Sequence, residues 1–227
     1  MVTLLAIESA TEALSVGLQV GDQILIRHTL APREHARLLL PTIASLLSEA
    51  DIARSALDAI AVGRGPGAFT GVRIAIAAAQ GLGLGLNRPL LPVSTLKILA
   101  QSQAAVASQV LTAMDARMGE IYAAVWSVSA AGLVDLLGAE LCINATDWQP
   151  KAGAATVGVG SGFAAYPGLF KELQRIPNAL PHARDLLALA KRDWELGRAL
   201  DAHLAQPVYL RNEVAVKTKD RVSMKTA

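Results

Sequence analysis

The chain is poor in charge and in cysteine, and each scarcity excludes a class of protein. Cys142 is the single cysteine among 227 residues, so the chain forms no internal disulfide and offers no thiolate cluster to a metal. Charged residues make up 18% of the chain, below the usual share of about 25%. The net charge of +2 is too small for a whole surface that binds nucleic acid. We therefore expect a protein of a reducing compartment, the cytoplasm.

The residue patterns of common enzymes are also missing. No histidine lies three or four residues from another, and the sequence has no His-Glu-x-x-His motif, no Gly-x-Ser-x-Gly elbow and no Walker lysine. The side chains left for acid–base or metal chemistry are Glu8, Asp115, Glu120, His28, His35, His182 and His203. We therefore predict no catalytic residue, no bound metal and no required cofactor.

Uncharged runs are too short or too polar for a membrane. Between Arg73 and Arg88 lie 14 uncharged residues, fewer than the ~18 that a spanning helix needs. The longer run from Ile98 to Met114 carries three Gln and three Ser or Thr residues. The first residues, Val2–Ile7, lack the basic region of a signal peptide and indicate a strand. We expect a soluble protein with no membrane partner.

The most distinctive stretch is the glycine-rich loop Gly65-Pro66-Gly67-Ala68-Phe69-Thr70-Gly71. It lies between a strand predicted over Leu57–Val62 and a helix predicted over Thr70–Leu86. A glycine turn that leads into a helix directs backbone N–H groups at an anion. A dinucleotide fingerprint is excluded, because no acidic residue for the ribose occurs between Asp58 and Asp115. The candidate contacts for a nucleotide or another anion are Gly65, Gly67 and Thr70.

Two successive parts of the chain follow one plan, which indicates duplicated α/β halves. The first part reads as strands Thr3–Glu8, Leu14–Val20 and Gln23–Thr29, helix His35–Ala50, strand Leu57–Val62, helix Thr70–Leu86, strand Leu90–Val93 and a helix from Ser94 to Ala107. The second reads as strands Val110–Asp115, Ile121–Val128 and Leu133–Leu141, a glycine loop over 158–162 and helix His182–Leu200. We predict domains 1–107 and 108–211, the last helix packing back on the first, and a basic, disordered tail over 212–227.

Two helices are more apolar than a single core stripe requires. The helix Thr70–Leu86 has one charge, Arg73, and its apolar positions circle the axis, so both of its sides should be covered. The helix His35–Ala50 is also broadly apolar, with Pro41 in its first turns. Either the second domain covers these helices or another chain does, and we favour another chain. The predicted partner interface is Leu39, Leu40, Ile43, Leu47, Ala75, Ala78, Ala79 and Leu82.

Five segments resemble the TsaB (YeaZ) family, and together they span residues 1–214. They are Leu4-Leu5-Ala6-Ile7-Glu8-Ser9-Ala10-Thr11, His35-x-x-x-Leu39-x-Pro41, the glycine loop continued through Val72-Arg73-Ile74, Asp115-Ala116-Arg117-Met118-Gly119-Glu120-Ile121-Tyr122 and Pro207-Val208-Tyr209-Leu210-Arg211. The resemblance implies an α/β protein of the actin/Hsp70-like ATPase (ASKHA) fold with two RNase-H-like lobes, the second reduced. The chain departs from the family pattern in two places, since Glu8-Ser9-Ala10 replaces Asp-Thr-Ser and Ala68 replaces serine.

The resemblance also implies a function. A TsaB protein is the non-catalytic scaffold that supports the transferase TsaD in making threonylcarbamoyladenosine next to the tRNA anticodon, with the ATPase TsaE acting on the pair. Alone it forms a homodimer through its first two helices, it meets tRNA only through the complex, and ATP or ADP can bind at the partner interface. TsaD carries two metal-binding histidines where Thr95 and Leu99 stand here, and neither side chain replaces an imidazole. The alternative is an enzyme, either an ATPase of this fold or a peptidase.

Overall fold

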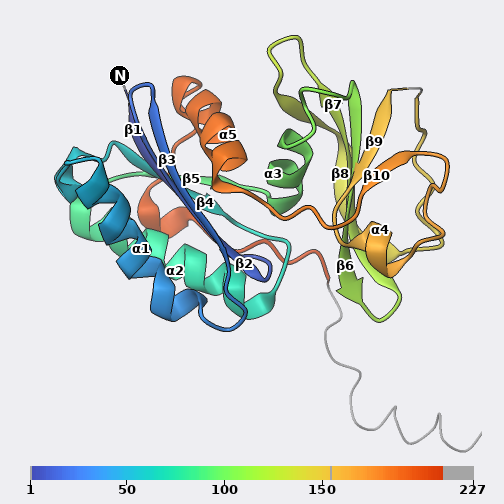
Figure 1. Ribbon diagram of the computed structural model, residues 1–227, viewed down its shortest axis with the longest axis horizontal. Coiled ribbons are helices and arrows are strands. Elements are labelled where there is room, and N and C mark those ends of the chain that lie inside the picture. The colour runs from blue at the N-terminus through green and yellow to red at the C-terminus, as the bar shows by residue number, and fades with distance from the viewer. Residues whose placement is uncertain (1, 154, 212–227) are drawn as a thin grey trace, which may run out of the picture.

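Two mixed sheets of five strands each, with the same strand order, form two lobes (Figure 1). The computed structural model describes residues 2–153 and 155–211, so the tail predicted over 212–227 lies outside the described residues. In each sheet, three strands form an antiparallel meander and two more run parallel to the first strand. The first sheet has the order β3-β2-β1-β4-β5, and the second has β10-β9-β6-β7-β8. This topology confirms the two RNase-H-like lobes expected from the sequence.

The strands of the first sheet are β1 (Thr3–Glu8), β2 (Ala13–Val20), β3 (Gln23–Leu30), β4 (Ala59–Gly63) and β5 (Leu90–Val93). Those of the second are β6 (Gln109–Arg117), β7 (Glu120–Val128), β8 (Val134–Asn144), β9 (Thr156–Val159) and β10 (Gln174–Ile176). The helices are α1 (His35–Glu49), α2 (Phe69–Leu86), α3 (Thr95–Gln101), α4 (Gly162–Ala165) and α5 (Ala183–Glu195).

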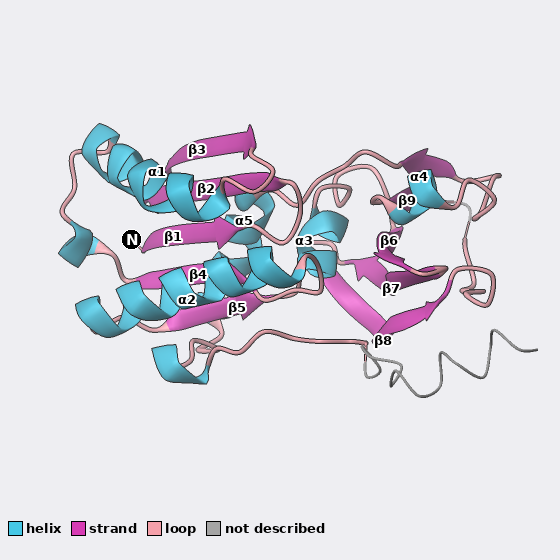
Figure 2. Ribbon diagram, turned by 90° about the horizontal axis from the view of Figure 1, so that it is seen from below, coloured by secondary structure: helices cyan, strands magenta, loops and turns pink. Residues whose placement is uncertain are grey.

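Helices cover both faces of the first sheet. α1 and α2 lie side by side on one face, and α5 lies on the other (Figures 1 and 2). The central strand β1 is therefore buried on both sides, which explains its continuous apolar run over Leu4–Ile7. α5 comes from the end of the described chain, and its Ala183 N–H donates to Ser15 Oγ of β2 at 2.8 Å. The domain boundary proposed after Ala107 therefore separates the sheets but leaves α5 on the first lobe.

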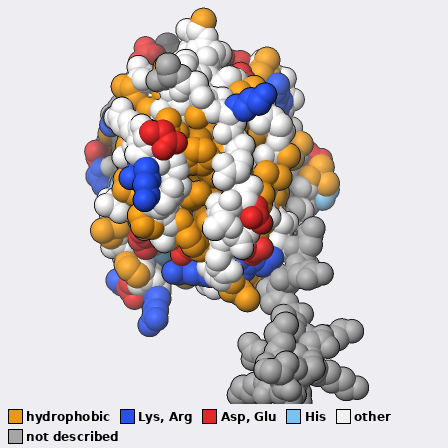
Figure 3. Space-filling view, turned by 90° about the vertical axis from the view of Figure 1, so that its right-hand side faces the viewer, with side chains coloured by type: hydrophobic (Ala, Val, Ile, Leu, Met, Phe, Trp, Pro, Cys, Tyr) orange, Lys and Arg blue, Asp and Glu red, His pale blue; other side chains and the backbone are white. Residues whose placement is uncertain are grey.

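The second lobe has less helix than the first. One face of its sheet packs on α3, and loops and the short helix α4 cover the other. A small core of Trp148, Phe163 and Leu169 forms under these loops. Figure 3 shows this end of the molecule, where hydrophobic side chains stay visible between polar and backbone atoms. The lobe is reduced, as expected, because loops replace helices here.

Several predicted element ends differ from the structure, among them those of β6 and β8, and three of the differences have a clear local cause. Leu57 closes a 3-10 turn by donating to the Arg54 carbonyl, so β4 begins later than predicted, at Ala59. α3 ends at Gln101 rather than Ala107, because the Ser102 hydroxyl bonds the Leu99 carbonyl and the chain continues in turns. α5 ends at Glu195 rather than Leu200, since Gly197 adopts φ +66 and stops the helix.

α2 was expected to be covered on both sides, by the second domain or by another chain, and the structure shows that the second domain does not cover its outer side. Its inner side packs against the first sheet, but Ala77, Gly81 and Leu84 are exposed, and no described segment covers them. With 18 residues and a mean hydropathy of 1.4, α2 is long and apolar enough to cross a membrane, although buried helices of globular proteins meet the same criteria. The uncharged run that begins after Arg73 is shorter than α2, because Arg73 lies inside the helix. The contact with the sheet accounts for the apolar inner side of α2. Its apolar outer side stays uncovered in the single chain.

Candidate functional site

The glycine-rich loop joins β4 to α2 and is fastened to the chain that follows β1. Ala68 N–H donates to the Ala10 carbonyl at 2.7 Å, and the Ser9 hydroxyl donates to the Gly71 carbonyl at 2.8 Å. A Cβ on Gly71 would lie 2.0 Å from the Ser9 carbonyl oxygen, and one on Gly67 would lie 2.4 Å from that of Ala10. Two backbone segments therefore touch where only glycine fits, and this contact sets the start of α2.

The candidate anion contacts do not lie together. Gly67 and Thr70 line the cleft between the lobes, whereas Gly65 is buried, with φ +91, near the Val208 carbonyl. The first N–H groups of a helix have no partner within it, and Ala68 provides no side-chain cap for α2. The residues at the start of α2 line the cleft on its first-lobe side, and anion binding there stays a prediction.

The cleft itself has a volume of about 1140 Å³ and is lined by both lobes. Its charged residues include Asp115 and Arg117, which form an ion pair at 3.0 Å. The Asp115 carboxylate also accepts the Arg117 N–H at 2.8 Å. Glu120, on the neighbouring strand, is paired with Arg211. Two of the candidate carboxylates are thus engaged by arginines and fix the β6–β7 turn and the C-terminal segment.

Glu8 is the third candidate carboxylate, and it is buried at the end of β1. Its Oε1 accepts the Ala10 N–H at 2.6 Å, and Thr95 Oγ1 lies 3.5 Å from Oε2. A Cβ on Gly63 would lie 1.8 Å from Oε2, so the carboxyl group also rests on the β4 backbone. Burial raises the pKa of Glu8 to about 7, although these hydrogen bonds oppose the shift.

The two positions that the resemblance aligns with the metal ligands of TsaD are also buried. Thr95 bonds Glu8 in the way just described, and Leu99 packs in the core between the lobes. Within residues 2–153 and 155–211, no group of three His, Cys, Asp or Glu side chains is placed to hold a metal ion.

Glu8→Gln is expected to remove a pH dependence from the stability of the protein. The pKa of Glu8 is about 7 in the folded state and near 4.5 when the chain is unfolded. Between these values the folded state keeps a proton that the unfolded state has lost, so the free energy of unfolding falls as pH rises. The loss over this window is about 3 kcal/mol. Gln keeps the acceptor for Ala10 and carries no charge, so the variant should be the more stable protein at pH 8.

Urea unfolding at pH 4, 6 and 8 measures this difference. Glu12→Gln, which neutralises an exposed carboxylate nearby, is the matched control and should follow the wild type. If the wild type and Glu8→Gln keep the same difference in stability at all three pH values, the burial of Glu8 is not what sets its pKa.

The predicted partner residues divide between core and surface. Those on the sheet side of the helices are at most 5% exposed and belong to the first-lobe core: Leu39, Ile43, Leu47, Ala75 and Ala79. These five side chains were predicted to contact a partner, and this is wrong because they are already buried in the single chain. Leu40 is 56% exposed, and Ala78 and Leu82 are half-buried. These three remain as candidates.

The exposed sides of the two helices carry apolar and small residues beside the exposed Arg37 and Arg73, and we call the apolar and small residues the outer face. It comprises Leu40 and Pro41 of α1 and Ala77, Ala78, Gly81, Leu82, Leu84 and Gly85 of α2. Leu84 is 64% exposed, and a Cβ on Gly81 or Gly85 would meet no atom within 4 Å. The helices lie next to each other in front of the sheet (Figure 2). The outer face is thus apolar and built largely of small residues, which allow a second helix to approach closely.

Sequence reasoning missed a cluster at the start of α2. The Arg73 guanidinium lies 3.2 Å from the ring centroid of Phe69 and 5.1 Å from that of Tyr209. Both rings are exposed. The sequence held a signal for this cluster, because both aromatic residues lie in segments that resemble the family. Phe69 is in the glycine-loop segment and Tyr209 in the C-terminal segment. Aromatic and arginine side chains of this kind are enriched at the centres of interfaces.

Two lobes of repeated RNase-H-like topology, with a glycine loop at the cleft between them, define an α/β protein of the actin-like ATPase (ASKHA) class. The family model described as "TsaD: tRNA N6-adenosine threonylcarbamoyltransferase" matches residues 26–147. The chain belongs to the TsaB family, as the resemblance predicted, on the similarities that follow.

The tRNA threonylcarbamoyladenosine biosynthesis protein TsaB of Escherichia coli (strain K12) is 39% identical over 94% of this chain and 96% of its own length. The protein of the same name from Haemophilus influenzae is 34% identical, over 95% and 96% respectively. The solved structure of YeaZ from Pseudomonas aeruginosa has a TM-score of 0.86 at 43% identity and covers 92% of this chain and 100% of that one. Both lobes are therefore shared with these proteins.

Proposed function

We propose that this chain is the non-catalytic subunit that supports TsaD in forming threonylcarbamoyladenosine in tRNA. The relatives that match along nearly the whole chain are named as biosynthesis proteins of this modified nucleoside. Further support comes from Thr95 and Leu99, which the resemblance aligns with the TsaD metal ligands; Thr95 is buried against Glu8, and Leu99 is buried in apolar surroundings. A supporting role for this chain requires a surface that holds the transferase.

The observation that carries the proposal is the outer face of α1 and α2. Burying one large apolar side chain stabilises a contact by roughly 1.5–3 kcal/mol, and Leu40 and Leu84 stand exposed on this face. The small residues between them give a second helix pair access to the backbone of α2. The partner with matching helices is a protein of the same fold, either TsaD or a second copy of this chain. Pairing with TsaD and self-pairing should therefore compete.

Light scattering tests the pairing directly. The purified chain should have the mass of a dimer, and adding TsaD should convert it to a complex with one copy of each protein. TsaE should bind this complex and should not bind the chain alone. A chain that stays monomeric and does not bind TsaD would contradict the proposal.

The remaining parts of the proposal depend on that complex. ATP or ADP is proposed to bind at the partner interface, and the candidate contacts are Gly67 and Thr70, which line the cleft between the lobes at the start of α2. Transfer RNA meets this chain through the complex, and the complex works in the cytoplasm. Isothermal titration with ADP, done on the chain alone and on its complex with TsaD, should show heat of binding for the complex only.

A further inference from the structure

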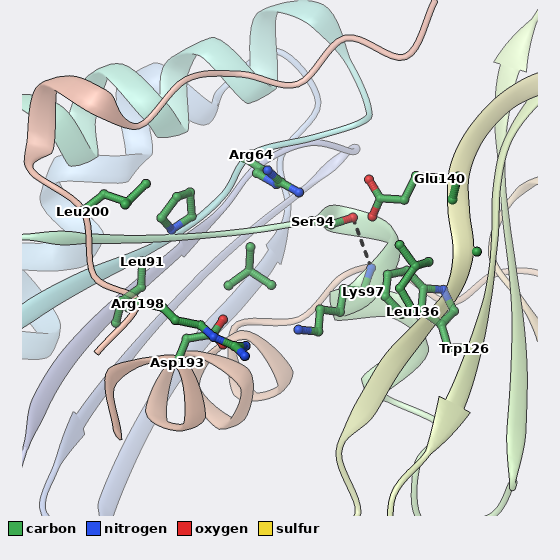
Figure 4. A pocket seen from close by; sticks show the side chains of 14 residues that line it. Arg64, Leu91, Ser94, Lys97, Trp126, Leu136, Glu140, Asp193, Arg198 and Leu200 are labelled. Atoms are coloured by element: carbon green, nitrogen blue, oxygen red, sulfur yellow. Dashed lines mark hydrogen bonds and ion pairs between the residues drawn. The ribbon is translucent and has the colours of Figure 1, made fainter. Parts of the chain in front are cut away.

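A second groove lies between the lobes, on the α5 side of the first sheet (Figure 4). Its volume is about 620 Å³, within the range of roughly 300–1,000 Å³ that is usual for small-molecule sites. β5 and the end of α5 form one wall, and α3 and β8 form the other. The groove is separate from the outer face, which lies on the opposite face of the first sheet.

Three cationic side chains from three parts of the chain line this groove: Arg64, Lys97 and Arg198. Arg198 is compensated, because it pairs with Asp193 at 3.0 Å. Neither Arg64 nor Lys97 forms an ion pair with any residue that the structure describes. In the same described part of the chain, Arg64 Nε is shielded from solvent and has no hydrogen-bond partner. A ligand in the groove cannot reach a nitrogen that the protein itself covers, so the terminal nitrogens of Arg64 are the donors available there.

The other residues of the groove limit what can bind. Glu140 faces Arg64 from β8, and Lys97 and Arg198 point toward one another across the groove (Figure 4). Three cations against two carboxylates leave the groove positive. Leu136 and Leu200 line it while 41% and 39% exposed, so they offer apolar surface. An inorganic ion would leave these two leucines uncovered.

We propose that this groove binds a small organic anion, a carboxylate or a phosphate ester with an apolar body. Its oxyanion is held by the positive charge of Arg64 and Lys97, and its apolar body covers Leu136 and Leu200. The terminal nitrogens of Arg64 would donate charge-assisted hydrogen bonds to this oxyanion. Burial lowers the pKa of Lys97, with help from Arg192, which shows that this cation is already partly removed from water.

Binding can be measured with simple probes by NMR of the labelled full-length chain. Benzoate and phenyl phosphate carry the two candidate anions on one apolar body, and benzamide is an uncharged molecule of the same shape as benzoate. We expect at least one of the anions to shift amide signals of groove residues, and benzamide to bind at least tenfold more weakly. Arg64→Met and Lys97→Met should each weaken anion binding about tenfold.

Two further variants keep the test decisive. Lys191→Met removes an exposed cation of α5 outside the groove and should leave binding unchanged. Glu140→Gln removes the carboxylate that opposes an anion and should tighten binding two- to fivefold, even if Lys97→Met fails to fold. Equal binding of benzoate and benzamide, signals shifted only outside the groove, or no tightening by Glu140→Gln would each overturn the proposal. Arg64→Met that folds should still pair with TsaD, which separates this site from the outer face.

Discussion

Gly71→Ala should lower the free energy of unfolding by more than about 4 kcal/mol, which is among the largest effects expected of a single methyl group. The new Cβ would lie 2.0 Å from the Ser9 carbonyl oxygen, so one of two backbone segments must move. Neither moves freely, because the Ser9 hydroxyl is bonded to the Gly71 carbonyl and Ala68 N–H to that of Ala10. The start of α2 would separate from β1, and both hydrogen bonds would be lost.

Urea unfolding followed by circular dichroism measures this loss, with Gly81→Ala as the control. Gly81 lies in the same helix, but a Cβ there meets no atom within 4 Å. Alanine also favours a helix over glycine, so the control should be more stable than the wild type by ~0.5–1 kcal/mol. Wild-type stability in Gly71→Ala would show that the glycine loop does not rest on the end of β1.

Gly81→Glu should weaken pairing with TsaD by at least 100-fold and leave the chain folded. The position is exposed in the single chain, so a glutamate side chain there fits without a clash and stays hydrated. In the proposed complex the same charge would be buried against an apolar helix without a partner, which costs several kcal/mol. A cost of about 2.7 kcal/mol already corresponds to 100-fold in the dissociation constant. Titration of TsaD, followed by light scattering or calorimetry, gives the ratio.

Two controls separate charge from position. Gly81→Ala adds a methyl group without charge and should still pair, while Ala164→Glu places the same charge on an exposed residue of α4 in the other lobe and should pair normally. Should Gly81→Glu bind TsaD as the wild type does, the outer face is not the interface. Should it unfold, Gly81 is core and the surface described here does not exist in solution.

The order of elements could be predicted from the sequence because strands and helices here have distinct patterns. Leu4–Ile7 is a continuous apolar run, and the tight turn at Gly21 separates two strands, so the meander follows from local rules. Helix ends were less predictable, since the Ser102 hydroxyl and the φ of Gly197 decide them and neither leaves a strong pattern. The residue pattern alone also could not show which strands α5 covers, because that depends on contacts between distant residues.

The candidate site was predictable to a coarser degree. The choice of α1 and α2 came from their composition, but the side that faces solvent did not. Alanine and glycine occur on every side of α2, so its periodicity does not separate buried Ala75 from exposed Ala77. The contact between Gly71 and Ser9 was also beyond the sequence, because it joins backbone atoms 62 residues apart.

The position of α5 has a consequence for how a cell makes this protein. Strands β1 to β5 leave the ribosome well before residues 183–195, yet the apolar side of their sheet is covered by Leu186 and Leu187 of that helix. A nascent chain therefore carries an open sheet face from the completion of β5 until residues 183–195 are made, and such a surface attracts chaperones and aggregates readily. Chains cut short before Ala183 would keep that face open permanently. Quality control should remove them, so a truncation before α5 would eliminate the first lobe as effectively as one within its own strands.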